Sequence, residues 1–339
     1  MWGRGFTEAQ LQAVAPVDRR RLDQALARLV EADILREVLL PPRLTYVFKH
    51  ALLQEAAYAS LPLDRRQQVH GQVAQVLEER FPETVATQPE LVAHRYTEAG
   101  VREQALAYWQ RAGQQALQRW AYLEAERHLT TALELFATLP DTPTRAQQEL
   151  DLQIALGPAL MLTKGTSAPE VAQTYARARA LCAQVGETPQ LFPILGGLWR
   201  FYWNQGVLPT ARELGEQLVE LAQHTADPTR HQVAHSALGS TLFHIGDYAA
   251  SWTHLEQGIT PTDLAVQRAL ALHHGEAFGV RGLGMAALTL WCLGYPTQAM
   301  RRSQEALALA RELTHPYSLA GAQHLAAFLH QRRREVPAA

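Results

Sequence analysis

The chain has 339 residues, of which 47% are hydrophobic and 19% are charged, so it has ample material for a core. Its net charge is −2, from 31 basic and 33 acidic groups, which argues against a protein that works mainly by neutralising phosphate or anionic lipid. Lys49 and Lys164 are the only lysines, and neither lies in the G-x-x-x-x-G-K-[ST] pattern of a phosphate-binding loop. The abundant alanine, leucine, glutamine, glutamate and arginine predict a mostly helical protein and argue against a nucleotide hydrolase that acts alone.

The cysteine content and the absence of long apolar runs indicate in which cellular compartment the protein lies. Cys182 and Cys292 lie inside apolar helical stretches, which favours a reducing compartment over a disulfide scaffold. No uncharged run approaches the roughly 20 residues that span a bilayer, and Met1–Phe6 is not followed by the apolar region of a secretory signal. We therefore expect a cytoplasmic protein that has no membrane partner.

The first 82 residues predict a small module of their own. Two helical stretches come first, and Asp18 is a suitable N-cap for the second. Apolar residues in Ile34–Leu40 and Leu44–Phe48 then predict a hairpin around the turn at residues 41–43. Helices followed by a two-stranded wing predict a winged-helix module over residues 1–82. The predicted helices of this module are residues 7–14, 18–33, 51–60 and 63–80.

The chain from residue 83 to residue 339 predicts helix pairs joined by short turns. Four stretches share one spacing, with small, aromatic or apolar residues seven and four positions before a glycine and five, nine and twelve positions after it. Small residues let antiparallel helices approach closely, and glycine lets the chain turn back. The four sets are Ala93, Tyr96, Gly100, Ala105, Trp109 and Ala112; Trp199, Tyr202, Gly206, Ala211, Gly215 and Leu218; Gly239, Leu242, Gly246, Ser251, Leu255 and Gly258; and Ala287, Leu290, Gly294, Ala299, Ser303 and Ala306.

This spacing resembles that of the tetratricopeptide repeat. The resemblance implies an all-α fold, an α-solenoid of tetratricopeptide-like helix hairpins over residues 83–339, preceded by the small winged-helix module. Gly206, Gly246 and Gly294 are 40 and 48 residues apart, so we expect longer helices and linkers than in the usual repeat of about 34 residues. The spacing is less clear before Gly206. Helices are expected there at residues 120–139, 147–162 and 169–185.

A second resemblance covers nearly the whole chain. Residues 46–58 read Y-V-F-K-H-A-L-L-Q-E-A-A-Y, and paired arginines follow at Arg65 and Arg66. This block resembles the segment after the ATPase core of bacterial STAND-type or AAA-like signalling ATPases, including those fused to class III adenylate or guanylate cyclases and those of LuxR-type regulators. Residues 148–153, 175–178 and 302–310 are similar to the helical-repeat region of the cyclase-linked members. The cyclase and Walker motifs of that family are missing from this chain, so the resemblance implies a fragment or truncated relative with no catalytic residues and no cofactor of its own.

The resemblance implies a non-catalytic protein-interaction and sensor scaffold that regulates an ATPase-cyclase signalling protein. The missing ATPase and cyclase domains would then be partners. One alternative is a fragment of an adenylate or guanylate cyclase, which binds ATP and makes cyclic nucleotide in domains outside this chain. Another alternative is a transcriptional regulator that uses the winged helix. Residues 18–33 mix arginines with acidic residues, which weakens attraction to phosphate, so we expect no nucleic-acid partner.

Histidines offer two candidate sites, and each also has a purely structural explanation. His50 follows the wing strand and opens a helix, so the resemblance to ATPase switches implies contact with nucleotide phosphates if an ATPase core is supplied. Its alternative role is to finish the strand and hydrogen-bond locally. His231 and His235 have the spacing of helical metal ligands, but no third ligand stands at a suitable distance, and we expect no metal site.

Three closely spaced glycines, Gly279, Gly282 and Gly284, resemble a phosphate loop in composition only. No strand precedes them and a repeat helix follows, so close packing of helices explains them better.

The residue three positions before the glycine is aromatic in three of the four repeat units, namely Trp203, Phe243 and Trp291. In tetratricopeptide geometry this position tends to face the concave groove, and aromatic residues beside polar ones suit recognition of a protein or peptide. The alternative is that longer helices bury these rings between units. The predicted groove residues are Arg200, Trp203, Asn204, Phe243, His244 and Trp291.

Overall fold

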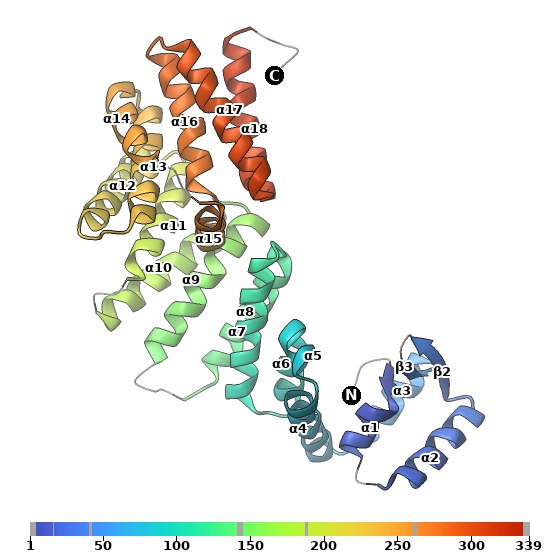
Figure 1. The fold of residues 1–339 in the computed structure, drawn as a ribbon. Helices are drawn as coiled ribbons and strands as arrows, with labels where there is room; N and C mark the ends of the chain where they lie inside the picture. Colours follow the sequence, from blue (N-terminus) through green and yellow to red (C-terminus); the bar gives the residue numbers. More distant parts are fainter. Residues whose placement is uncertain are drawn as a thin grey trace. The chain divides into compact units, whose positions relative to one another are not determined.

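The computed structural model describes residues 5–15, 17–40, 43–140, 145–186, 189–259 and 263–334. The chain divides into two compact units (Figure 1). Unit 1 comprises Met1–Ala112 and Glu134–Leu139, and unit 2 comprises Gly113–Leu133 and Pro140–Ala339. The predicted module boundary at residue 82 stays a prediction.

Unit 1 begins with two helices and a three-stranded sheet. The predicted hairpin is confirmed, since β2 and β3 pair antiparallel with Val38 opposite Thr45. A third strand, β1, pairs with the other side of β3 and was not predicted, because three residues are too few to show an alternating pattern. The elements are β1 (Gly5–Thr7), α1 (Glu8–Val14), α2 (Arg19–Glu31), β2 (Leu35–Leu40), β3 (Arg43–Phe48), α3 (Ala51–Ala59), α4 (Leu63–Arg80), α5 (Pro82–Thr87), α6 (Pro89–Glu98) and the first part of α7 (Arg102–Gln118).

The start of α2 follows the sequence prediction closely. Asp18 is the N-cap, and its Oδ1 accepts a hydrogen bond of 3.0 Å from the backbone N–H of Arg21. Leu22 and Leu26 on one face of α2 are buried against the sheet residues Leu35 and Tyr46. Residues 41 and 42 of the predicted turn lie outside the described residues, and the assignment of this region as a winged-helix module stays a prediction.

Unit 2 is built from consecutive helices that pack as hairpins, for example α9 on α10, α11 on α12, α13 on α14 and α16 on α17. This is the predicted all-α solenoid of tetratricopeptide-like hairpins. Its elements after α7 are α8 (Tyr122–Ala137, of which the residues from Glu134 belong to unit 1), α9 (Arg145–Thr163), α10 (Pro169–Val185), α11 (Leu191–Asn204), α12 (Leu208–Gln223), α13 (Pro228–Ile245), α14 (Tyr248–Gly258), α15 (Leu264–His274), α16 (Phe278–Cys292), α17 (Pro296–Leu313) and α18 (Pro316–Arg332).

The turn glycines have the conformation that the repeat spacing predicts. Gly206, Gly246 and Gly294 have φ of +75°, +96° and +87° and follow the first helix of each hairpin. A further hairpin with the same spacing joins α7 to α8, but Trp120, with φ +60°, takes the place of its glycine. The sequence predicted the helix at residues 120–139 but not the turn before it, because no glycine stands at the turn position. The residues at its other repeat positions are Gly113, Ala116, Ala125, Leu129 and Ala132.

An additional helix accounts for the long interval between the third and fourth units. The expected linker is in fact interrupted by α15, which packs against α9, α11, α16 and α17. Buried Gln267 anchors α15, because its Nε2 donates to Gln232 Oε1 at 2.6 Å and its Oε1 accepts from the backbone N–H of Gly279 at 3.1 Å. This helix brings its C-terminal end against α11 and the start of α16.

The end of α17 carries avoidable backbone strain. Thr314 is exposed and has φ +55°, a conformation that disfavours β-branched side chains. We expect Thr314→Gly to raise the free energy of unfolding by about 1 kcal/mol, measured by urea denaturation. Gly294 lies at a turn with φ +87° and has open space around its Cα. Gly294→Ala should therefore lower the free energy of unfolding by about 1 kcal/mol, because the loss comes from backbone conformation alone. Equal effects of the two variants would contradict this account.

Within the described residues, no helix combines the length and the apolar character that crossing a membrane requires.

Candidate functional site

A pocket of about 390 Å³ lies in unit 2 among α11, α13, α16 and α18. Four of the six predicted groove residues line it, because the last turns of two repeat helices converge there. They are Trp203 and Asn204 from α11, and Phe243 and His244 from α13. Their role in binding a partner stays a prediction.

The other two predicted groove residues lie elsewhere. Arg200 is buried one turn before Asn204, whose Nδ2 donates to the Arg200 carbonyl at 2.7 Å. Trp291 does not line the pocket and packs, partly buried, against the cluster that contains Leu288 and Leu290. Trp203 and Phe243 are also only partly buried, so these two rings both pack between helices and face the pocket.

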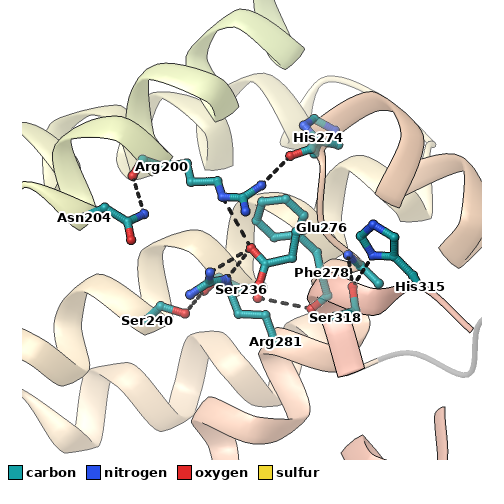
Figure 2. Close-up of polar contacts among 11 residues, drawn as sticks. Arg200, Asn204, Ser236, Ser240, His274, Glu276, Phe278, Arg281, His315 and Ser318 are labelled. Carbon is teal, nitrogen blue, oxygen red and sulfur yellow. Dashed lines mark hydrogen bonds and ion pairs between the residues drawn. The ribbon is translucent and has the colours of Figure 1, made fainter. Parts of the chain in front are cut away.

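A buried ion cluster forms one wall of the pocket (Figure 2). Arg281 donates to Glu276 Oε2 from Nε at 2.9 Å and from Nη2 at 2.7 Å. Arg200 Nε lies 3.7 Å from the same oxygen. Arg200, Glu276 and Arg281 are only 1%, 5% and 7% exposed, so all three charges are removed from water.

The cluster depends on how α15 ends and α16 begins. Gly275, with φ +68°, terminates α15 and turns the chain so that Glu276 faces α11. Arg200 then donates from Nη1 to the last carbonyl of α15, that of His274, at 2.6 Å. A cation at a helix C-terminus interacts favourably with the helix dipole, so Arg200 holds both the end of α15 and the carboxylate that follows it.

The surroundings of the cluster favour the charged form of Arg200 and the neutral forms of His274 and His315. Burial acts to lower the pKa of Arg200, but Glu276 and the tyrosines around it outweigh burial and raise that pKa above its usual value. Burial lowers the pKa of His274 to about 3, and that of His315 to about 4, and Arg200 lowers both further. At neutral pH these histidines are uncharged and leave the positive charge to the guanidinium groups.

His315 connects the site to distant parts of unit 2. Its Nε2 lies 2.6 Å from the hydroxyl of Tyr122, 193 positions earlier, and its ring centroid lies 4.4 Å from that of Trp120. Its Nδ1 lies 2.8 Å from Ser318 Oγ, which accepts from the backbone N–H of Ala277 at 3.0 Å. These contacts tie α8, α18 and the connection before α16 together.

Acid should unfold this protein through its buried histidines. Burial lowers the pKa of His70, His235 and His315 to about 4 and that of His274 to about 3, below the ordinary value near 6.5. The folded state therefore binds fewer protons than the unfolded chain, so stability present above pH 6.5 is lost as the pH falls towards 4. We expect a loss of about 1 kcal/mol or more per histidine between pH 7 and pH 5 in urea titrations.

The control for this prediction separates buried from exposed histidines. His315→Gln should flatten the dependence of unfolding free energy on pH, because one depressed group is removed. His224→Gln, at an exposed position, should leave the dependence unchanged. A pH-independent wild-type protein would contradict the assignment.

His50 is the exposed N-cap residue of α3, and its side chain makes no capping hydrogen bond. A second pocket, of about 540 Å³, lies in unit 1. Phe48 and Ala51, on either side of His50 in the sequence, line this pocket, but His50 does not. Inside that pocket the Tyr58 hydroxyl lies 3.0 Å from His70 Nε2. The predicted contact of His50 with a nucleotide phosphate stays a prediction.

The remaining histidine candidates form a ring stack. His231 and His235 have ring centroids 6.2 Å apart, and His235 Nδ1 lies 3.0 Å from Nδ1 of His254 on α14. Across the part of the chain that the structure describes, no group of three or more His, Cys, Asp or Glu residues is placed to hold a metal ion.

The packing explanation of the clustered glycines is confirmed for Gly279 and Gly284, whereas a Cβ atom at Gly282 would make an ordinary contact of 3.4 Å with Ser236 Oγ. All three lie inside α16. A Cβ atom at Gly279 would lie 2.7 Å from Gln267 Oε1, and one at Gly284 would lie 2.6 Å from Leu325 Cδ1.

The hairpin array and its turn geometry define a tetratricopeptide-like helical repeat fold. No protein-family model matches the chain. An uncharacterized protein of Rhizobium meliloti (strain 1021) is 24% identical over 322 residues, which make up 94% of this chain and 31% of that protein. The chain thus spans less than a third of the length of the curated relative it matches.

Two solved structures are similar to parts or most of the chain. One is the Signal Transduction ATPase with Numerous Domains (STAND) protein with a tetratricopeptide repeat sensor from Pyrococcus horikoshii, at 10% identity and a TM-score of 0.47, covering 96% of this chain and 51% of that one. The other is a set of nearly identical TPR-like repeats from a Podosopora anserina putative kinesin light chain, at 20% identity and a TM-score of 0.43, covering 62% of this chain and 96% of that one.

Proposed function

We propose that this chain is the non-catalytic interaction and sensor segment of a larger signalling ATPase. The sequence block at residues 46–58, which resembles the segment after such an ATPase core, lies on β3 and α3 in unit 1. A hairpin array follows it along the chain. The match to the Rhizobium meliloti relative covers 94% of this chain but only 31% of that protein, which supports a role as one segment of a larger protein.

The observation that carries the proposal is the pocket formed at equivalent repeat positions. Trp203 and Phe243 both stand three residues before a turn glycine, and both line the same pocket. Repeat arrays bind partners on concave surfaces of this kind, where aromatic residues serve as anchors. In this proposal the array receives a signal or a protein partner and biases the ATPase, which in turn controls an attached cyclase.

The proposal predicts regulation of ATP turnover. We would measure ATP hydrolysis by the intact Rhizobium meliloti relative and by the same protein without the segment that matches this chain. A change in the rate of several-fold on deletion supports a regulatory segment. An intact relative that hydrolyses no ATP, or whose rate is unaffected by the deletion, contradicts it.

A second measurement tests the non-catalytic assignment in this chain alone. Calorimetric titration with Mg-ATP should give no saturable heat, because neither lysine lies in a phosphate-binding loop. Tight binding of Mg-ATP to the chain would contradict a scaffold and sensor role.

A further inference from the structure

The pocket in unit 2 has an excess of positive charge on its buried wall. Among the described residues, Arg200 and Arg281 share Glu276 as their only carboxylate partner. Arg281 and Glu276 line the pocket, and Arg200 lies directly behind them. Two guanidinium groups paired with one carboxylate leave one net positive charge, which is costly in a site removed from water unless an anion offsets it.

The helix ends around the pocket do not cancel this charge. The C-terminus of α15, which accepts from Arg200, carries a partial charge of about −0.5. The first turns of α16 and α18 also border the pocket, through Val280 and Arg281 on one and Tyr317 and Ser318 on the other. Each of these N-termini contributes about +0.5, and the C-terminal ends of α11 and α13, which also line the pocket, contribute about −0.5 each, so the helix ends together offset only about half of the excess positive charge.

Hydrogen-bond donors remain unused on the same wall. Nη1 of Arg281 donates to no group among the described residues, while Nε and Nη2 are occupied by Glu276. The indole Nε1 of Trp203 is buried and likewise has no acceptor within the described chain. Buried donors are nearly always satisfied in folded proteins, so the indole N–H of Trp203 calls for an acceptor that enters the pocket. The Arg281 guanidinium carbon lies 4.6 Å from the Trp203 ring centroid, so the two groups that carry these donors lie against each other.

Apolar residues form much of the remaining pocket wall, beside the polar side chains of Asn204, His244, Ser318 and His324. Phe243, Met285, Leu288, Leu325 and Phe328 line it. A volume of about 390 Å³ falls in the range of small-molecule sites, roughly 300–1,000 Å³, which bury most of a ligand against apolar and aromatic walls. The shape and lining therefore suit an apolar body attached to a polar group at one end.

We propose that this pocket binds a small organic acid whose carboxylate meets Arg281 and Trp203 and whose apolar or aromatic body packs against Phe243 and Phe328. A single carboxylate matches the single excess charge, and it accepts the unused donors of a planar guanidinium with good geometry. The apolar walls favour an organic acid over an inorganic phosphate. This inference goes beyond the proposed interaction scaffold, because it assigns a small-molecule signal to the sensor array.

The test uses the full chain and three matched probes in isothermal titration calorimetry at pH 7. They are 3-phenylpropionate, its neutral amide 3-phenylpropionamide and the cation 3-phenylpropylamine. We expect the carboxylate to bind at least tenfold more tightly than the amide and the amine not to bind. Equal affinity of carboxylate and amide, or no binding of the carboxylate, overturns the proposal.

Variants locate the binding. Arg281→Gln should weaken 3-phenylpropionate at least tenfold, and Trp203→Phe, which keeps an aromatic ring but removes the N–H, should weaken it several-fold. Arg301→Gln, at an exposed arginine on α17, is the matched control and should bind as the wild type does. If Arg281→Gln fails to fold, the affinity of Trp203→Phe for 3-phenylpropionate alone tests the site. Wild-type affinity in Trp203→Phe would then overturn the proposed carboxylate site.

The outcome is separate from that of the proposed regulation. Calorimetry with these probes involves neither ATP nor a partner protein, so an absent carboxylate site leaves the ATP-turnover experiment unaffected. In the same way, a relative without ATPase activity would leave a measured carboxylate affinity in this pocket intact.

Discussion

Replacement of Glu276 by glutamine is expected to lower the free energy of unfolding by about 3–5 kcal/mol, because it leaves two buried guanidinium groups without a counter-charge. Glu276 Oε2 accepts both hydrogen bonds from Arg281 and lies 3.7 Å from Arg200 Nε. All three side chains are at most 7% exposed, so the guanidinium groups left without the carboxylate are poorly solvated. Urea denaturation followed by circular dichroism measures the loss.

The control is an ion pair of similar length at the surface. Arg302 Nη1 lies 2.7 Å from Glu305 Oε2, but Glu305 is 40% exposed, so Glu305→Gln should cost less than about 1 kcal/mol. The double variant Glu276→Gln with Arg281→Gln should recover part of the loss, because one of the unpaired charges is removed. A loss for Glu276→Gln no larger than that for Glu305→Gln would show that the cluster is not electrostatically coupled.

Substitution of Gly197 by alanine should destabilise unit 2 by about 3 kcal/mol, at the upper end of the range for overpacked cores. The ring of Tyr175 on α10 is fully buried between Gly157 of α9 and Gly197 of α11. A Cβ atom at Gly197 would lie 2.2 Å from Tyr175 Cζ, and one at Gly157 would lie 2.4 Å from it. Carbon atoms pack at about 3.5–4.0 Å, so the ring or a helix must move.

Two variants check the cause of this loss. Gly321→Ala in α18 meets no atom within 4 Å, so it should raise stability by about 0.5–1 kcal/mol through better helix propensity. Tyr175→Leu in the Gly197→Ala background should recover part of the loss, because the smaller side chain leaves room for the new methyl group. If Gly197→Ala is as stable as Gly321→Ala, helix packing at Tyr175 is looser than the structure indicates.

The sequence by itself was sufficient to predict the helix hairpins. The spacing of small residues around Gly206, Gly246 and Gly294 depends on contacts between neighbouring helices, so it is local and repeats along the chain. The N-cap at Asp18 and the β2–β3 hairpin were predictable for the same reason. Of the three aromatic residues that share one repeat position, Trp203 and Phe243 line the same pocket, whereas Trp291 does not.

Features that break the local pattern were not predictable. Trp120 replaces a turn glycine, and its positive φ is offset by packing against His315, almost two hundred positions later. The three-residue strand β1 forms only because β3 offers it an edge. The inserted helix α15 has ordinary helical composition, and nothing in its own sequence says that it packs against α9 and α11.

The charged part of the candidate site was decided by tertiary structure alone. In the sequence, Glu276 and Arg281 look like ordinary solvent-exposed residues, and Arg200 was expected in an open groove rather than beneath a pocket. Their pairing depends on where α15 ends relative to α11 and on α18 closing the far wall. Helical periodicity predicts which residues a side chain contacts within its own hairpin. The burial of a charge also depends on every other helix that packs against that side chain.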